Sequence, residues 1–235
     1  YSTNNGVSWS GRITIQSGSV DKNFAASDDA VSSAYYGRSY CVWSNFALGQ
    51  PPIMCGYTTN SGVSWTGVMQ VNTPLSGHYS QGCDVMCGPN GQVYICWAAP
   101  TSASPYTEDY CGFASSTTGG TSWTVLNNAF DMNGIRATTF NGWNFRVNGF
   151  TRIGVDRSGG PRNGWIYIVA AEKNLAPAGT DADVILHSSS NGGATWSAGV
   201  RVNQDPLNNG KVQFFPAIRV DENGGVNVCY YDNRN

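Results

Sequence analysis

The residues best suited to ligand chemistry lie in the stretch Tyr230-Tyr231-Asp232-Asn233-Arg234. An aromatic pair is followed there by a carboxylate and a guanidinium. Aromatic faces can pack on sugar rings, and charged side chains make strong hydrogen bonds. We therefore take Tyr231, Asp232 and Arg234 as candidate ligand-binding residues. The same stretch equally suits a salt bridge between neighbouring units of the fold, and the sequence leaves both alternatives open.

Other chemical patterns are not found in the sequence. His78 and His187 have no recognisable nucleophile partner, so surface or core positions are expected for them. No set of Cys and His residues has the spacing of a zinc site, and we predict no metal. The many Gly-Gly pairs indicate turns rather than a phosphate-binding loop or a dinucleotide motif, so we predict no cofactor.

Composition indicates an all-β domain and excludes several partners. The 235 residues include 29 glycines, 12% aromatic and only 12% charged residues, a mixture typical of many short strands joined by tight turns. A net charge of −2 provides no basic surface for nucleic acid. No apolar run reaches the roughly 18–20 residues that cross a bilayer, and we find no signal peptide. We expect that any targeting segment was removed or is not part of this chain.

An eight-residue pattern occurs four times along the chain. It reads Ser/Thr-x-Asn/Asp-x-Gly-x-Ser/Thr-Trp, and its copies span 2–9, 58–65, 116–123 and 189–196. The tryptophans are 56, 58 and 73 residues apart, a repeat length that indicates a propeller or an array. The positions that define the copies are Asn4, Gly6 and Trp9; Asn60, Gly62 and Trp65; Thr118, Gly120 and Trp123; and Asn191, Gly193 and Trp196.

Each octapeptide predicts a tight hairpin turn. Its third residue can bond to nearby backbone amides, as Asn commonly does in turns. Its fifth residue is Gly in all four copies, which suits a positive φ that a Cβ would resist. The final Trp returns the chain to a strand and supplies a large apolar surface for packing.

The alternation of apolar and polar residues predicts four strands for each repeat. The units are about 18–72, 73–130 and 147–203, with a fourth formed by 204–235 together with 1–17, all in one domain over 1–235. Residues 10–17 are predicted to be an outer strand, and 127–147 an insertion. The two ends therefore either share one sheet or belong to a segment of a larger ring.

The four octapeptides resemble the Asp-box, or bacterial neuraminidase repeat, of sialidase-like β-propellers. The resemblance implies an all-β propeller of four-stranded antiparallel blades, with about four blades represented here. Sialidase-like propellers usually have six, so the chain is either a small propeller or part of a larger one. In that family the Asp-box is a structural turn, and the active site lies at the opposite face. The loops expected at that face are 45–52, 98–109, 171–183, 204–214 and the tail from Asp232.

The same resemblance implies a set of candidate catalytic residues. Phe150-Thr151-Arg152-Ile153-Gly154 is similar to the family's Arg-Ile-Pro signature, with Gly154 in place of Pro. Arg152 would then hold a substrate carboxylate, and Glu172 or Asp183 would act as acid/base. The second and third arginines of the family pattern are not evident. The alternative is that Arg152 pairs with a neighbouring carboxylate and that the acidic residues are solvated.

Four of the seven cysteines form two similar pairs in successive repeats. Cys41 and Cys55, and likewise Cys96 and Cys111, fall on what we interpret as adjacent strands of one blade. We predict these two disulfides, which suit an exported protein; buried free thiols are the alternative.

Three functions follow as hypotheses. The first is an exported, secreted or cell-surface module that binds glycans or glycoconjugates. The second is a glycoside hydrolase of the exo-sialidase type, and the third is a structural repeat of a large surface protein that assembles with further domains. The incomplete arginine set favours binding over hydrolysis.

Overall fold

The structure is a computed structural model that describes residues 1–136 and 146–234. The described residues form β-strands and loops and contain no helix, so none of them belongs to a helix that could cross a membrane. The strands are β1 (Val20–Ser27), β2 (Ser39–Asn45), β3 (Ile53–Thr58), β4 (Thr66–Gln70), β5 (Gln81–Cys87), β6 (Val93–Pro100), β7 (Glu108–Ser116), β8 (Thr124–Asp131), β9 (Arg152–Val155), β10 (Ile166–Glu172), β11 (Asp183–Ser189), β12 (Val200–Arg201), β13 (Gln213–Val220) and β14 (Val226–Asp232).

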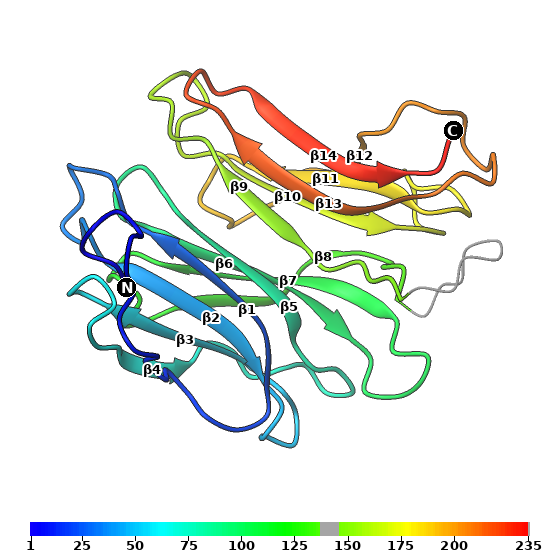
Figure 1. The fold of residues 1–235 in the computed structure, drawn as a ribbon. Helices are drawn as coiled ribbons and strands as arrows, with labels where there is room; N and C mark the ends of the chain where they lie inside the picture. Colours follow the sequence, from blue (N-terminus) through cyan, green and yellow to red (C-terminus); the bar gives the residue numbers. More distant parts are fainter. Residues whose placement is uncertain (137–145, 235) are drawn as a thin grey trace.

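The strands form four antiparallel sheets that follow one another along the chain. Three sheets have four strands each, in the orders β1-β2-β3-β4, β5-β6-β7-β8 and β9-β10-β11-β12, and β13 and β14 form a fourth sheet of two strands. Figure 1 shows the first two sheets in the lower half of the molecule and the last two in the upper half. The prediction of an all-β fold with four-stranded antiparallel units is confirmed.

Apolar side chains fill the space between successive sheets. Val42 and Ile53 of the first sheet pack against Val85 and Ile95 of the second. These strands are buried on both faces, as their nearly continuous apolar sequences require. Similar clusters join the second sheet to the third through Phe113, Ile153 and Ile168, and the third to the fourth through Tyr167, Val169 and Ile218.

The four octapeptides adopt the same hydrogen-bonded turn. In the last copy the hydroxyl of Ser189 accepts from the Gly193 amide at 2.9 Å, and the Asn191 side-chain oxygen accepts from the Thr195 amide at 3.0 Å. In the third copy the hydroxyl of Thr118 replaces the Asn oxygen and accepts from the Ser122 amide. The predicted positive φ of the fifth residue is confirmed, with 83° at Gly6, 85° at Gly62, 81° at Gly120 and 90° at Gly193.

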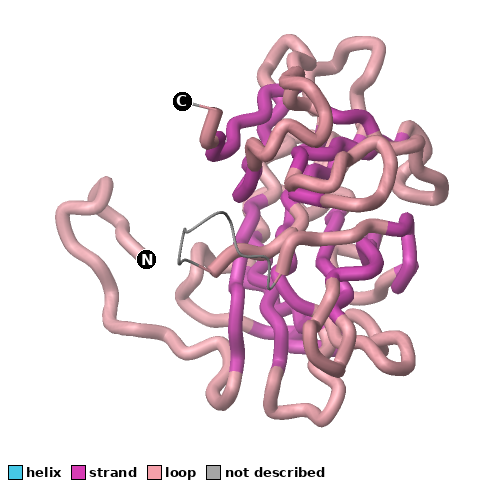
Figure 2. Tube along the Cα trace, turned by 90° about the vertical axis from the view of Figure 1, so that its right-hand side faces the viewer, coloured by secondary structure: helices cyan, strands magenta, loops and turns pink. Residues whose placement is uncertain are grey.

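The N-terminal segment differs from its prediction. Residues 10–17 form no strand, and β13–β14 has only two strands, so the two ends do not share a sheet. Instead Ile15 packs against Trp43 and Met54 on the outer face of the first sheet, and Trp43 Nε1 donates to Gln16 Oε1 at 2.8 Å. This contact partly buries Ile15, while Ile13 remains exposed. Figure 2 shows the N-terminal segment as a loop separate from the strands near the C-terminus.

Two further strand predictions are corrected. The fourth strand of the second sheet continues to Asp131, so the predicted insertion 127–147 begins with strand residues. The sequence predicts the first strand of the first sheet at about Phe24 to Ser27, and the structure begins it at Val20, four residues earlier. The rest of the insertion includes 137–145, which lie outside the described residues.

The predicted disulfide between Cys41 and Cys55 is wrong, because both carry free thiols. Cys41 lies opposite Gly56 and Cys55 opposite Val42 in the β2–β3 pairing. Successive strand residues point to opposite faces, so the two thiols lie on different faces of the sheet.

The predicted disulfide between Cys96 and Cys111 is also wrong. Cys96 lies opposite Phe113 and Cys111 opposite Ala98, so the two cysteines share a face but are diagonal neighbours. Diagonal positions are about 7–8 Å apart, which exceeds the usual Cα separation of a disulfide. The register thus keeps the two thiols apart.

Candidate functional site

The two ends of the sheets carry different kinds of loop. The octapeptide turns lie at one end, and the loops after β2, β6 and β10 lie at the other, together with the connections between sheets and the C-terminus (Figure 1). We call this second end the mouth end, because the first strands β1, β5, β9 and β13 begin there. The predicted separation of structural turns from the other loops is therefore confirmed.

Three of the first strands begin with a β-bulge. Their registers shift between Asp21 and Phe24, between Gln81 and Asp84, and between Phe214 and Ala217. Each bulge contains a residue with positive φ: Lys22 at 54°, Gly82 at 69° and Phe215 at 49°. Bulges redirect side chains and are common beside functional sites. Residues with side chains in this conformation are strained, and such strain often marks a binding surface.

A polar chain of hydrogen bonds crosses two of these strands. Gln81 Nε2 donates to Asp21 Oδ2 at 2.8 Å, and Arg136 Nη1 donates to Gln81 Oε1 at 2.6 Å. The Arg136 guanidinium lies 5.8 Å from the ring centroid of Tyr79 and 5.4 Å from that of Tyr106. We call Asp21, Tyr79, Gln81, Tyr106 and Arg136 the Arg136 cluster.

The Arg136 cluster has the chemistry of an anion or sugar site. Within residues 1–136 and 146–234, no carboxylate forms an ion pair with Arg136. A guanidinium is a planar donor that binds carboxylates through two parallel bonds. The side chain of Tyr106 is 41% exposed, so an aromatic face is accessible beside the guanidinium.

A buried carboxylate lies next to the backbone of the Arg136 cluster. Glu108 is fully buried, and its Oε2 accepts from the backbone amides of Gly149 at 2.7 Å and Arg136 at 3.3 Å. Burial raises the pKa of Glu108 to about 7, although these two amides and the Arg136 charge act in the opposite direction. A carboxyl group that titrates near neutral pH can act as a general acid or base when it reaches a substrate.

The predicted ligand-binding residues lie on the last sheet at the mouth end. Tyr231 is 66% exposed and stacks on Phe214, with ring centroids 5.5 Å apart. Phe215, the strained bulge residue, meets Tyr231 edge-on. Asp232 forms an ion pair with Arg234, two residues along the chain, at 2.5 Å. Tyr231 thus presents an open aromatic face, while Asp232 and Arg234 neutralise each other.

Arg152 lies in a groove between the first strands. The groove has a volume of about 630 Å³ and is lined by β1, β5, β9 and β13–β14. The guanidinium lies 4.4 Å from the ring centroid of Phe24, and its Nη1 donates to the Thr151 carbonyl at 3.0 Å. Burial raises the pKa of Asp84 in the same groove, against the attraction of Arg152. Neither Glu172 nor Asp183 lines this groove.

Glu172 and Asp183 lie opposite each other at the mouth end of β10 and β11, and both are buried. Glu172 Oε2 accepts from the Asn133 amide at 3.4 Å, and Oε1 lies 3.8 Å from His187 Nε2. Asp183 forms an ion pair with Arg201 at 2.6 Å. The structure therefore brings the two predicted acidic residues together but separates them from Arg152, and their assignment as catalytic residues stays a prediction.

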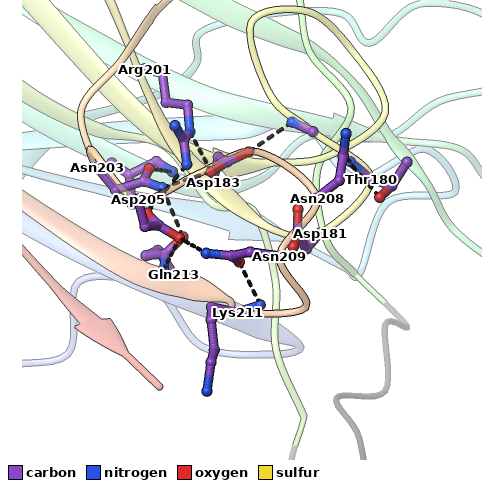
Figure 3. A network of polar contacts seen from close by, with 12 residues as sticks. Thr180, Asp181, Asp183, Arg201, Asn203, Asp205, Asn208, Asn209, Lys211 and Gln213 are labelled. Atoms are coloured by element: carbon purple, nitrogen blue, oxygen red, sulfur yellow. Dashed lines mark hydrogen bonds and ion pairs between the residues drawn. The ribbon is translucent and has the colours of Figure 1, made fainter. Parts of the chain in front are cut away.

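Asp183 belongs to a larger polar network in the loops of the third and fourth sheets (Figure 3). Asn203 Nδ2 lies within hydrogen-bonding distance of three acceptors, on Asp183 at 2.6 Å, Asp205 at 2.8 Å and Gln213 at 2.8 Å, which share its two hydrogens. Burial alone would raise the pKa of Asp205, but hydrogen bonds from Asn203 and Asn209 hold it below its ordinary value. The network fixes these loops and occupies the Asp183 carboxylate.

The sequence reasoning did not identify Arg136 and Glu108. Arg136 follows β8 in the predicted insertion, where no strand pattern marks it. Glu108 begins a strand in one of the loops assigned to the mouth end, and its only signal is an acidic pair with Asp109 directly before a buried strand. Their proximity depends on pairing between distant segments, which sequence patterns do not show.

Comparison with known proteins adds information on the fold. No protein-family profile and no curated protein matches the chain. An α-L-arabinanase of Penicillium chrysogenum, solved with arabinobiose, aligns with a TM-score of 0.62 at 11% identity over 90% of this chain and 57% of its own. A protein of unknown function from Dyadobacter fermentans aligns with a TM-score of 0.57 at 13% identity over 92% of this chain and 62% of its own.

The chain therefore spans about three fifths of the length of the two structures that it resembles. At these identities the likeness concerns the fold alone. The chain has a β-propeller-like fold of four-stranded antiparallel sheets.

Proposed function

We propose that this chain is a glycan-binding module whose site is the mouth end of its sheets. The observation that carries the proposal is the Arg136 cluster, where a guanidinium that forms no ion pair with a carboxylate of the described residues lies close to two tyrosine rings. Aromatic faces can pack on sugar rings, and the guanidinium suits a sugar carboxylate. The open face of Tyr231 supplies a second aromatic contact at the same end.

The burial of the acidic side chains favours glycan binding over glycoside hydrolysis. Glycoside hydrolysis commonly uses two carboxyl groups on either side of the scissile bond. Here Glu108, Glu172 and Asp183 are buried, and Asp183 is engaged by Arg201 and Asn203. A tyrosine nucleophile is the known exception, but burial raises the pKa of Tyr79, which opposes its activation.

Hydrolysis is the second candidate, because Glu108 has a pKa near 7 and lies beside Arg136 and Tyr79. A movement that opened this carboxyl group to a bound glycan would give it the protonation behaviour of a general acid. The structures that resemble this chain include an arabinanase, which supports testing arabinosides as substrates.

We further propose that the four octapeptides are Asp-boxes of a sialidase-like scaffold and that the protein is secreted or displayed at the cell surface. The shared turn geometry of the four copies supports the first statement. The proposed glycan ligand supports a location outside the cell, because glycoconjugates are abundant there. Assembly with further domains of a surface protein remains the third hypothesis.

The test is calorimetric titration with 3′-sialyllactose, lactose and arabinobiose. Lactose lacks the whole sialic acid residue of 3′-sialyllactose and shares its disaccharide, so this pair isolates the contribution of the acidic sugar. We expect tighter binding of 3′-sialyllactose and a loss of about tenfold or more in Arg136→Gln. Arg162→Gln is the matched control, because Arg162 donates to the Gly224 carbonyl at the opposite end of the sheets.

The outcomes separate the hypotheses. Binding without turnover supports the binding module, and release of a chromophore from an aryl arabinoside or sialoside supports the hydrolase. If the folded protein binds none of the three sugars and hydrolyses neither glycoside, the structural-repeat hypothesis takes precedence. Equal binding by wild type and Arg136→Gln would remove the Arg136 cluster as the site.

A further inference from the structure

The carboxylate of Glu108 connects two backbone positions that are distant in sequence. Its Oε2 accepts from the amide of Arg136 at 3.3 Å and from the amide of Gly149 at 2.7 Å. The Glu108 carbonyl accepts in addition from the Gly134 amide at 3.0 Å. One residue at the start of β7 therefore holds the chain on both sides of Arg136.

The neighbouring glycines leave space for this carboxylate. A Cβ at Gly134 would come within 2.1 Å of Glu108 Oε2, and one at Gly149 within 2.7 Å. The other carboxylate oxygen, Oε1, is buried and has no hydrogen-bond partner among residues 1–136 and 146–234. A buried carboxylate with one unpaired oxygen is costly, so a plain structural role leaves this arrangement unexplained.

We propose that Glu108 is a positioning residue for the ligand site: its carboxylate fixes the backbone from which the Arg136 side chain reaches Gln81, and loss of its proton tightens that hold. This inference rests on the proposed function and adds its regulation. Hydrogen bonds to an ionised acceptor are shorter and about twice as strong as those to a neutral one. The ionised carboxylate therefore orders Arg136 for binding, and the protonated one loosens it.

The charged and titratable groups around Glu108 come from three elements. Arg136, after β8, attracts the ionised form, and Tyr79, before β5, interacts with it electrostatically. Glu172 at the end of β10 accepts from Asn133, the residue before Gly134. Burial outweighs the attraction of Arg136 and raises the pKa of Glu108 to about 7. The hydrogen bonds from the two amides to the carboxylate therefore change in strength near neutral pH.

The direct test needs no ligand. The amide signals of Arg136 and Gly149 are followed by two-dimensional NMR from pH 5 to pH 9. We expect both amide protons to move downfield together, with one shared midpoint near pH 7. Glu108→Gln should abolish this titration. Glu172→Gln is the matched control and should preserve it, because Glu172 contacts Asn133 rather than the two amides.

The inference is overturned if the two amides do not titrate in the wild type, or if they titrate equally in Glu108→Gln. The wild-type result alone decides the matter if the variant does not fold. With 3′-sialyllactose as the probe, Glu108→Gln should bind about tenfold more weakly than wild type at pH 8 and equally at pH 5.5. A wild type that binds no sugar would remove the proposed function, while the ligand-free titration would still decide the role of Glu108.

Discussion

Gly193, the fifth residue of the last octapeptide, lies against the ring of Phe113 in the preceding sheet. A Cβ at Gly193 would come within 2.0 Å of Phe113 Cε1. Trp196 closes the same turn and packs edge-on against that ring, with centroids 5.1 Å apart. This octapeptide thus fixes a hairpin and also joins two successive sheets.

Replacement of Gly193 should therefore cost more than replacement of the adjacent Gly192. Both residues have positive φ, but a Cβ at Gly192 meets nothing within 4 Å. The chain already tolerates Asn5 and Ser61 at the position equivalent to Gly192, with φ of 55° and 56°. We expect Gly193→Ala to lower the free energy of unfolding by about 3 kcal/mol or more, and Gly192→Ala by about 1 kcal/mol. Urea denaturation checks this, and equal losses would contradict the contact with Phe113.

The free energy of unfolding should fall as the pH rises from about 4.5 to 7. In this window the folded protein keeps the Glu108 proton that the unfolded chain has released, because burial raises the pKa of Glu108 to about 7. The state that binds more protons loses stability as the pH rises, here by up to about 3 kcal/mol. Glu108→Gln should remove this slope in denaturation experiments at pH 5 and pH 8, whereas Glu222→Gln on an exposed turn should not. Parallel pH profiles for wild type and Glu108→Gln would contradict the prediction.

Asn203→Ala should destabilise the loops shown in Figure 3. Asn203 is buried, and its amide group contacts Asp183, Asp205 and Gln213, so its removal leaves buried polar atoms unpaired. We expect a loss of about 2–4 kcal/mol in thermal or urea denaturation. Asn209→Ala, which removes the contact of an exposed residue to the same Asp205, should cost less than about 1 kcal/mol. Similar losses in both variants would mean that burial is not the cause.

The free thiols predict a simple reaction with Ellman's reagent. Cys229 is exposed and should react in the folded protein. The other six thiols are buried, and burial raises the pKa of Cys55, Cys87 and Cys96 to about 12, so they should react only after unfolding. We expect all seven to react in guanidinium without a reductant, and a Tm that does not change with dithiothreitol. Fewer than seven would indicate a disulfide.

Tyr231→Ala should weaken sugar binding and lower the free energy of unfolding by only about 1 kcal/mol. The side chain is largely exposed, so its truncation removes an open aromatic face together with the ring contact to Phe214. We expect a loss of about three- to tenfold in affinity for 3′-sialyllactose. Tyr36→Ala is the control, because Tyr36 is 60% exposed but lies in the turn between β1 and β2, at the opposite end. An equal effect of both variants would argue against a contact at Tyr231.

Local patterns in the sequence predicted much of the fold. The octapeptide turns, with their positive-φ glycines, and most strands of the three four-stranded sheets depend on nearby residues, and they were recognised. The prediction of a strand at residues 10–17 is wrong because an alternating pattern suits a strand but does not require one. In the structure Ile15 packs on Trp43 from a loop. The pattern shows that one face is apolar but not which surface covers it.

The candidate site was much less predictable. Arg136 reaches Gln81 and Tyr79 across more than fifty positions of sequence, and the pKa of Glu108 depends on burial that only the folded chain creates. The two predicted disulfides failed for a related reason, because cross-strand register decides whether two cysteines meet. Residue types indicated sugar chemistry at Tyr231, but the positions of its partners required the structure.

The sheet of β13 and β14 packs on the third sheet through Ile218 and Val228, while Ala217, Arg219 and Tyr231 remain exposed on its other face. The sheets mainly contact their neighbours in sequence, as in a linear array of repeats. The two-stranded sheet has fewer packed residues than the others, so warming should melt it first. The protein would then lose its affinity in two stages, with the contact at Tyr231 disappearing while the Arg136 cluster is still intact.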